Sequence, residues 1–317
     1  MARRKNKSSI EPAVLQMKYV MPVNEAADTI RFIDIFSDLS LANRKLMRQG
    51  YQLGVGSITV NDDSGLTRSV DMSFKTAGNN WITQNAFVKG HALWVEMNKE
   101  VLADNPSIRG TWQDYKIRLV ESHITSNTLQ IRDGSGNAWP AGAEWRMSTY
   151  VVPQHDVDAA GVVLPAEEYT ACLVGPSDEP NNIISLVQAY ENSRATVQDT
   201  SPNVPAALPN SFYLRLTDDG SQDPELAIII ADDNEKPPYP NTPGAYPGGE
   251  IFATGSLFTQ QRGIMNDFQP TLHLGGFVAP CGLVQIVAQS ALAGNVEIIV
   301  DLLVGPYKGV MAVPMGQ

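Results

Sequence analysis

The sequence has little of what disulfide-bonded domains and many active sites are built from. Among 317 residues there are only two cysteines and four histidines. Cys172 and Cys281 lie far apart within apolar stretches, which favours buried free thiols over a disulfide. This cysteine usage fits synthesis in a reducing cytoplasm.

Motifs that carry catalysis or bind a cofactor are also missing. None of His91, His123, His155 and His273 stands in a metal-ligand spacing, and there is no GxSxG, P-loop or GxGxxG pattern after a strand. Acidic clusters at 62–63, 218–223 and 232–235 offer oxygen atoms to Ca²⁺, but none matches the twelve-residue calcium loop, and Asp also simply forms turns. We therefore expect no enzymatic activity, no catalytic residue, no cofactor and no metal site.

Long apolar runs are absent too. No run reaches the roughly 18 residues that a membrane helix needs, and the apolar stretch 298–304 is interrupted by Asp301. The N-terminal charges are not followed by the apolar core of a signal peptide. A hydrophobic content of 43% with 18% charged residues indicates a globular chain, long enough for one large or two moderate domains.

Positive charge is scarce, and part of it is concentrated at the N-terminus. The chain has 23 Lys and Arg against 34 Asp and Glu, a net charge of −11. A short basic cluster attracts phosphate by counterion release and needs no folded site. Residues 1–12 are therefore predicted to be a basic arm that contacts nucleic acid or an anionic membrane, although a merely solubilising terminus has the same composition. The arm cations are Arg3, Arg4, Lys5 and Lys7.

Alternation of apolar and polar residues dominates the rest of the chain and predicts a β-rich fold. Residues 51–60 place Tyr51, Leu53, Val55 and Ser57 on one face, and with 69–74 they predict a hairpin. A second turn is predicted at Asp133 to Gly136. The expected strands cover 14–20, 51–60, 69–74, 113–122, 126–132, 144–152, 168–175, 211–217, 226–231, 250–260, 271–279, 282–289 and 295–304.

Helical periodicity is limited to a few segments. An apolar stripe predicts a helix over 82–102, a second helix is expected to begin after Asn182, and a short third one over 39–48 is expected to end at Gly50. The stripe consists of Phe87, His91, Trp94, Met97 and Val101.

Two segments, 196–210 and 232–249, are rich in proline. Proline fixes φ and removes a hydrogen-bond donor, so both are predicted to be extended loops. Such stiff loops suit contacts between subunits, although a surface loop without a role remains the alternative.

Several blocks between residues 44 and 153 resemble coat proteins of marine and freshwater single-stranded DNA viruses. The blocks stand in the same order as in those proteins, and none of them is a catalytic motif. Chain length and strand count also resemble the double jelly-roll major capsid proteins of the Finnlakevirus group. The two halves of this chain, however, lack visible similarity to each other. The matching blocks are 44–51, 80–82, 85–90, 105–108, 114–117, 144–148 and 151–153.

The resemblance implies a double jelly roll that forms trimeric capsomers on an internal membrane, with one jelly roll carrying large insertions as the alternative. Residues 13–176 are expected to form the first jelly-roll sandwich and 177–317 the second.

Strand content, long loops, the basic arm and the missing active site lead separately to the same expectation. The chain is predicted to be a virion capsid protein, made in the host cytoplasm, that self-assembles into an icosahedral shell. Its partners would be further copies, other virion proteins, and the genome or a membrane through the arm. The competing functions are a phage receptor-binding or lectin-like β-sandwich and a β-sandwich glycan-active enzyme.

Overall fold

The computed structural model describes residues 11, 13–25, 27–62, 65, 68–108, 114–124, 128–139, 145–152, 167–177, 182–191 and 257–316. Of these residues, 46% lie in strands and 21% in helices, which confirms the expectation of a mostly β protein with less than a quarter helix. Within the described part of the chain, no helix combines the length and hydropathy needed to cross a membrane.

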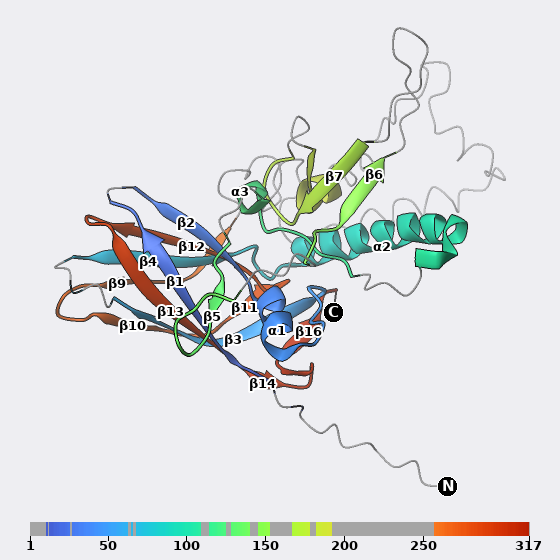
Figure 1. Cartoon of the computed structure of the whole chain (residues 1–317). Coiled ribbons are helices and arrows are strands. Elements are labelled where there is room, and N and C mark those ends of the chain that lie inside the picture. The colour runs from blue at the N-terminus through green and yellow to red at the C-terminus, as the bar shows by residue number, and fades with distance from the viewer. Residues whose placement is uncertain are drawn as a thin grey trace, which may run out of the picture.

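Two antiparallel sheets pack face to face and form a sandwich (Figure 1). The first sheet has the order β10-β3-β13-β1-β5, and β11 and β16 also pair with β3; the second has the order β2-β12-β4-β9. The strands of the first sheet are β1 (Gln16–Val23), β3 (Tyr51–Asn61), β5 (Ile131–Arg132), β10 (Thr271–Leu274), β11 (Phe277–Pro280), β13 (Gly294–Leu302) and β16 (Ala312–Pro314). Those of the second are β2 (Thr29–Asp34), β4 (Val70–Thr76), β9 (Phe258–Met265) and β12 (Leu283–Ser290).

Strict alternation along the strands creates the core between the sheets. In β1, Met17, Tyr19, Met21 and Val23 are buried, while the residues between them are partly or fully exposed. The strands β4 and β13 alternate in the same way. Because side chains of a strand point to opposite faces in turn, each strand contributes one face to a shared core.

Strands from both ends of the chain pair with each other. Gln16 pairs with Asp301 in β1 and β13, β2 pairs with β12, β3 with β10 and β11, and β4 with β9. The expected boundary after residue 176 therefore does not separate these two sets of strands, since both contribute to the same two sheets.

The predicted hairpin of 51–60 and 69–74 is wrong, although both strands exist. β3 lies in the first sheet and β4 in the second, so the connection between them crosses from one sheet to the other. The expected face of β3 is also wrong at Ser57. A register shift opposite Asp301 and Leu302 moves the buried positions from Leu53 and Val55 to Ile58 and Val60, as a β-bulge does.

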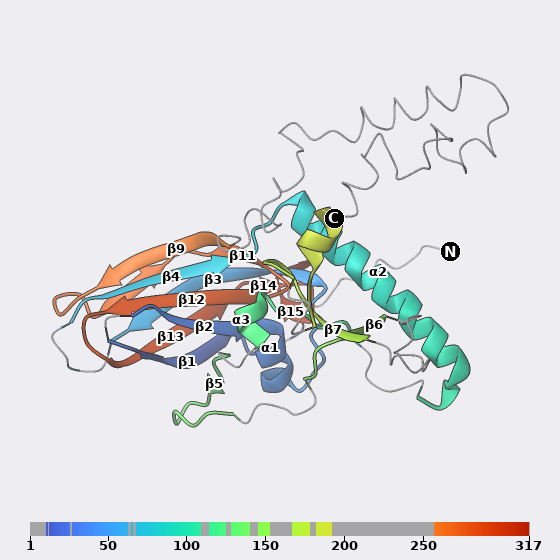
Figure 2. The same cartoon turned by 90° about the horizontal axis from the view of Figure 1, so that it is seen from above.

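The described part of the segment between β4 and β9, apart from β5, forms a body beside one end of the sandwich (Figure 2). The parallel pair β7–β8 and the antiparallel pair β6–β7 make a small three-stranded sheet. The described elements of this insertion, besides β5, are α2 (Trp81–Asp104), the 3-10 helix η1 (Pro106–Ile108), α3 (Glu121–Ile124), β6 (Thr149–Val152), β7 (Glu167–Cys172) and β8 (Ile183–Ser185).

The insertion has a core of its own that reaches into the sandwich. Ile117, Leu173 and Val187 are buried there together with Phe32 and Leu283, which belong to β2 and β12. The insertion therefore packs on the sandwich through side chains that the sandwich supplies.

The helix predicted over 82–102 is confirmed as α2, but its apolar stripe is only partly buried. Phe87 is 3% exposed, whereas Trp94 and Met97 are half-buried and His91 is exposed. Gly90 explains the close packing of the first half, because an added Cβ would lie 2.8 Å from Leu186 Cδ2. The second half of α2 lacks comparable cover among the described residues.

Two other helices differ from their predicted bounds. The helix α1 (Ile35–Asn43) begins four residues earlier than expected and ends at Arg44 instead of Gly50. The helix expected directly after Asn182 is preceded by β8 and covers 186–191. The turn predicted at Asp133 is confirmed, since Gly136 N donates to Asp133 O at 3.0 Å.

The last described strands are short. β14 (Val304–Gly305) pairs with β15 (Gly309–Val310), and β16 then pairs with β3. The proline-rich loops 196–210 and 232–249 and the strands expected at 211–217 and 226–231 lie outside the described residues, so these expectations stay predictions.

Candidate functional site

A cleft of about 490 Å³ opens where α1, the loop that follows it and the insertion meet. This volume is within the range of about 300–1,000 Å³ that is usual for small-molecule sites. Its lining includes Asp34 and Asp38 from the α1 region, and Lys116, Arg118 and Trp145 from the insertion.

Asp34 is the N-cap of α1. It follows β2 directly, and Ser37 N donates to its carboxylate at 3.1 Å, as is usual for Asp at a helix start. Gln49 Nε2 and Trp145 Nε1 donate to Oδ2 at 2.8 and 2.9 Å. Burial raises the pKa of Asp34, while these hydrogen bonds and the charge of Arg118 oppose the rise.

Asp38 lies one helical turn further along α1 and is 8% exposed. The hydroxyl of Tyr19 donates to its Oδ2 at 2.7 Å. Burial raises the pKa of Asp38 well above its ordinary value, and the neighbouring charge of Asp34 adds to the rise. The carboxyl of Asp38 is therefore held in an environment that favours its neutral form.

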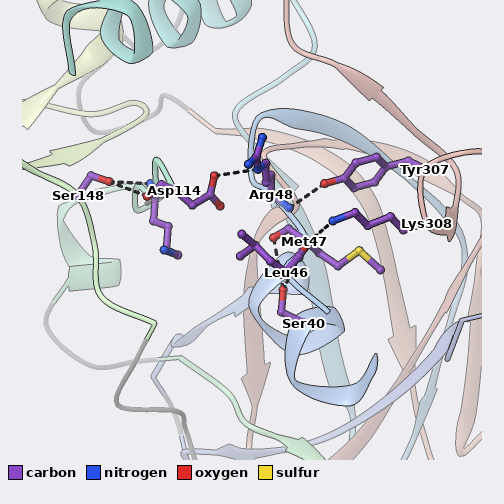
Figure 3. Close-up of polar contacts among 9 residues, drawn as sticks. Ser40, Leu46, Met47, Arg48, Asp114, Ser148, Tyr307 and Lys308 are labelled. Carbon is purple, nitrogen blue, oxygen red and sulfur yellow. Dashed lines mark hydrogen bonds and ion pairs between the residues drawn. The ribbon is translucent and has the colours of Figure 1, made fainter. Parts of the chain in front are cut away.

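The loop between α1 and β3 forms the rim of the cleft and is anchored to distant parts of the chain (Figure 3). Met47 N donates to Ser40 Oγ at 2.8 Å, and Arg48 N donates to the Tyr307 hydroxyl at 2.9 Å. The ammonium of Lys308 donates to the carbonyl of Leu46. Backbone contacts to the C-terminal segment thus fix the loop before any ligand arrives.

Arg44 closes α1 in an unusual conformation. Its φ is +51° and its ψ is 38°, the left-handed region in which helices commonly end on glycine. For a residue with a Cβ this conformation costs roughly 1–2 kcal/mol. Arg44 and Lys45 are exposed at the rim, and Lys45 pairs with the exposed Glu11 at 3.2 Å.

Another part of the lining comes from the segment of the insertion that follows α2 and η1. The Lys116 ammonium lies 5.0 Å from the ring centroid of Trp145, a cation–π distance. Ile117 N donates to Gln49 Oε1 at 2.7 Å, so the side chain of Gln49 bridges this segment and Asp34. Arg118 lies 3.4 Å from Nε2 of His123.

Asp114 ties the insertion to the rim loop from outside the cleft. Its Oδ1 lies 3.6 Å from Arg48 Nε, as Figure 3 shows. Its Oδ2 is buried and has no hydrogen-bond partner. Burial raises the pKa of Asp114, and the charges of Lys116, Arg48 and Lys308 oppose the rise.

The four predicted contact residues of the arm, Arg3, Arg4, Lys5 and Lys7, lie outside the described residues. Their expected contact with nucleic acid or membrane therefore stays a prediction, and nothing places them near the cleft.

Other side chains considered from the sequence are packed or paired within the fold. His123 is buried against Phe32, with ring centroids 4.5 Å apart, and burial lowers its pKa well below the ordinary value. Asp62 binds Arg68 at 2.7 Å. Cys172 and Cys281 are buried free thiols, as predicted. Among the residues that the structure describes, no group of three or more potential metal ligands occurs.

The cleft was not among the sites expected from the sequence. Asp34 could have been noticed as an acidic residue between a strand and a helix, with Asp38 four positions later on the same helix face. Trp139 and Trp145 also line the cleft, and no local pattern in the sequence singles them out. Two cations of the lining come from residues 116 and 118, and no local pattern links them to residue 34.

Comparison with known proteins gives no relative. No family model, curated protein or solved structure matches this chain.

Proposed function

We propose that this chain is the coat subunit of an icosahedral virus, built as one jelly roll with a large insertion. The observation that carries the proposal is the nested pairing of the strands. A long two-stranded ribbon rolled into two sheets would pair its first strand with its last and its second with its second-last. The pairs β1–β13, β2–β12, β3 with β10 and β11, and β4–β9 follow this order, as we expect of a chain wrapped as a jelly roll.

The same pairing favours one jelly roll over the expected double one. The described strands before β4 and after β9, apart from the separate β14–β15 pair, all belong to a single sandwich. The insertion between them supplies only short strands among the described residues. Its described part therefore supports the alternative of one jelly roll with a large insertion.

Jelly rolls occur in viral capsids, lectins and other binding proteins, so the fold alone does not decide the function. The cationic arm before an acidic body favours a shell subunit, because one side of a shell meets the genome or a membrane and the other meets solvent. The resemblance of residues 44–153 to coat proteins of single-stranded DNA viruses points the same way. Trimeric capsomers and a location in the virion are part of this proposal.

A glycan-binding or glycan-active sandwich is the second candidate. Two carboxylates and two tryptophans line one cleft, and aromatic platforms with carboxylates suit sugars. Against this candidate, the carboxylate of Asp34 already accepts three hydrogen bonds from protein donors. It is therefore poorly placed to exchange a proton with a substrate.

Electron microscopy of the purified full chain, together with sedimentation, tests the proposal. We expect closed shells or uniform trimers. A monomer at all concentrations that binds glycans on an array would overturn the coat-subunit assignment and support the second candidate.

A matched variant tests the arm. Replacing Arg3, Arg4, Lys5 and Lys7 by Gln should leave shells intact but lower their nucleic-acid or lipid content. With four phosphate contacts, the logarithm of arm affinity should fall with log salt at a slope of roughly −3 to −4. Unchanged content, or cleavage of the arm by protease on intact shells, would place the arm outside.

A further inference from the structure

We propose that the cleft between α1 and the insertion binds a nucleotide unit of single-stranded nucleic acid. This site is separate from the arm and does not require shell formation. The charge of the lining, its aromatic side chains and the fixed rim support the proposal.

The lining has a charge opposite to that of the chain as a whole. Four basic residues and two acidic ones line the cleft, whereas the chain carries −11. The two carboxylates lie at the buried side and accept hydrogen bonds from protein donors, while Arg44 and Lys45 are exposed at the rim. A cleft with positive charge toward solvent selects an anionic ligand, which a neutral glycan is not.

The aromatic residues indicate that the anionic ligand also carries a flat ring, such as a nucleobase. Trp145 is fixed, since its Nε1 donates to Asp34 and Lys116 lies over its ring. Trp139 lines the same cleft and is half-buried, and its backbone N donates to Ile131 O at 2.9 Å. Aromatic rings beside cations are how proteins hold single strands, with bases stacked and phosphates paired. Trp139 is therefore assigned to stacking and Arg44 to the phosphate, since Lys45 already pairs with Glu11.

The conformation of Arg44 gives an independent reason. Non-glycine residues in the left-handed region are concentrated at ligand sites, where the surrounding structure enforces them. Arg44 has φ +51° and stands directly on the rim. Glycine would suit this backbone position better, but it would remove one of the four cations.

The test uses the full chain with its four arm cations replaced by Gln, so that the arm cannot contribute. The probe is a fluorescein-labelled single-stranded DNA of about twelve nucleotides, within the usual site sizes for such proteins. Fluorescence anisotropy is measured over a series of salt concentrations. Arg44→Gly and Trp139→Ala are the cleft variants. Lys99→Gln is the control, because Lys99 is a 63% exposed cation on α2 away from the cleft.

The chain without arm cations should still bind the probe, and Arg44→Gly should make the salt slope shallower by roughly 0.7. Trp139→Ala should weaken binding by roughly 5- to 150-fold, the range for loss of one stacked base. Arg44→Gly should also raise the melting temperature, so its weaker binding cannot result from unfolding. Lys99→Gln should bind within about twofold of the parent, since one distant exposed charge is screened.

Three results would overturn the proposal: no binding once the arm cations are replaced, unchanged binding in both cleft variants, or equal loss in Lys99→Gln. Electron microscopy of the same preparations reports shell formation separately. Failure of the cleft and failure of the coat function can therefore be told apart.

Discussion

In the sandwich, strands that are hundreds of residues apart in sequence pair over their whole length, whereas the insertion uses a long helix and strands of a few residues. The eight registered pairs of β1 with β13 are an example of the first kind. In the insertion, β8 contributes three residues and joins β7 in parallel. Each core also contains side chains of the other region: Leu129 and Ile131 of the insertion lie in the sandwich core, and Phe32 and Leu283 of the sandwich lie in the core of the insertion. The insertion and the sandwich are therefore packed together by side chains that each supplies to the core of the other.

The two regions can be observed separately. All five tryptophans, at 81, 94, 112, 139 and 145, belong to the insertion. Tryptophan fluorescence therefore follows the insertion, while the β signal in far-UV circular dichroism follows mainly the sandwich. Coincident unfolding curves from the two probes would indicate one cooperative unit.

The largest effect is expected for Phe74→Ala. Phe74 is fully buried in β4, and truncating a buried Phe usually costs about 3–5 kcal/mol of unfolding free energy. Because the insertion packs on the sandwich, the midpoints in urea from both probes should fall together. Phe268, which is 99% exposed, provides the matched control: Phe268→Ala should change stability by no more than about 0.5 kcal/mol. A normal fluorescence transition in Phe74→Ala would mean that the insertion is independent.

The next largest effect separates the two halves of α2. Phe87→Ala should cost about 3–5 kcal/mol, because Phe87 is buried. Trp94→Ala should lower the unfolding free energy by only about 1–2 kcal/mol, since Trp94 is half-buried and buries less apolar area on folding than Phe87. Urea unfolding followed by circular dichroism compares the two variants. Equal losses would show that the second half of α2 is packed as tightly as the first.

The smallest effect, of the order of 1 kcal/mol, concerns pH and Asp38. Burial raises the folded-state pKa of Asp38, while the unfolded value stays near 3.9. Between these two values the folded state binds more protons than the unfolded state, so stability falls as pH rises through this window. Asp38→Asn removes the free-energy cost of burying a charged carboxylate, and the Asn side chain can still accept the hydrogen bond from the Tyr19 hydroxyl. This variant should be more stable than the parent at neutral pH, and this gain should vanish in acid.

Asp71 is the control with the opposite sign. Arg262 donates to both its oxygens, at 3.1 and 2.6 Å, and these bonds lower the pKa of Asp71. That carboxylate stabilises the fold above its unfolded pKa, and the contribution is lost as pH falls through the folded value. Asp71→Asn should therefore lose stability at neutral pH and not in acid. Urea titrations at several pH values measure both variants, and slopes of the same sign would contradict the assignment.

Much of the fold could be predicted from the sequence because strands and helices leave a local periodicity. The alternation in 14–20 and 69–74 and the stripe of 82–102 correspond to real elements. Pairing partners could not be predicted, because no local sequence pattern indicates that β4 pairs with β12 and β9 and not with β3. The cleft was missed for the same reason. Its residues look ordinary alone, and only the fold brings Asp34 within 2.9 Å of Trp145 Nε1.

The nested strand order also governs how the chain can fold while it is being synthesised. When β4 has left the ribosome, its partners β9 and β12 have not yet been synthesised. β1 likewise has no partner strand until β13 has been synthesised. Contacts between such distant residues form slowly, and unpaired apolar strands are prone to aggregate. The sandwich can thus close only after β9 to β13 have been synthesised. The supply of chaperones, and not only the affinity between finished subunits, should limit how much protein becomes usable in a cell.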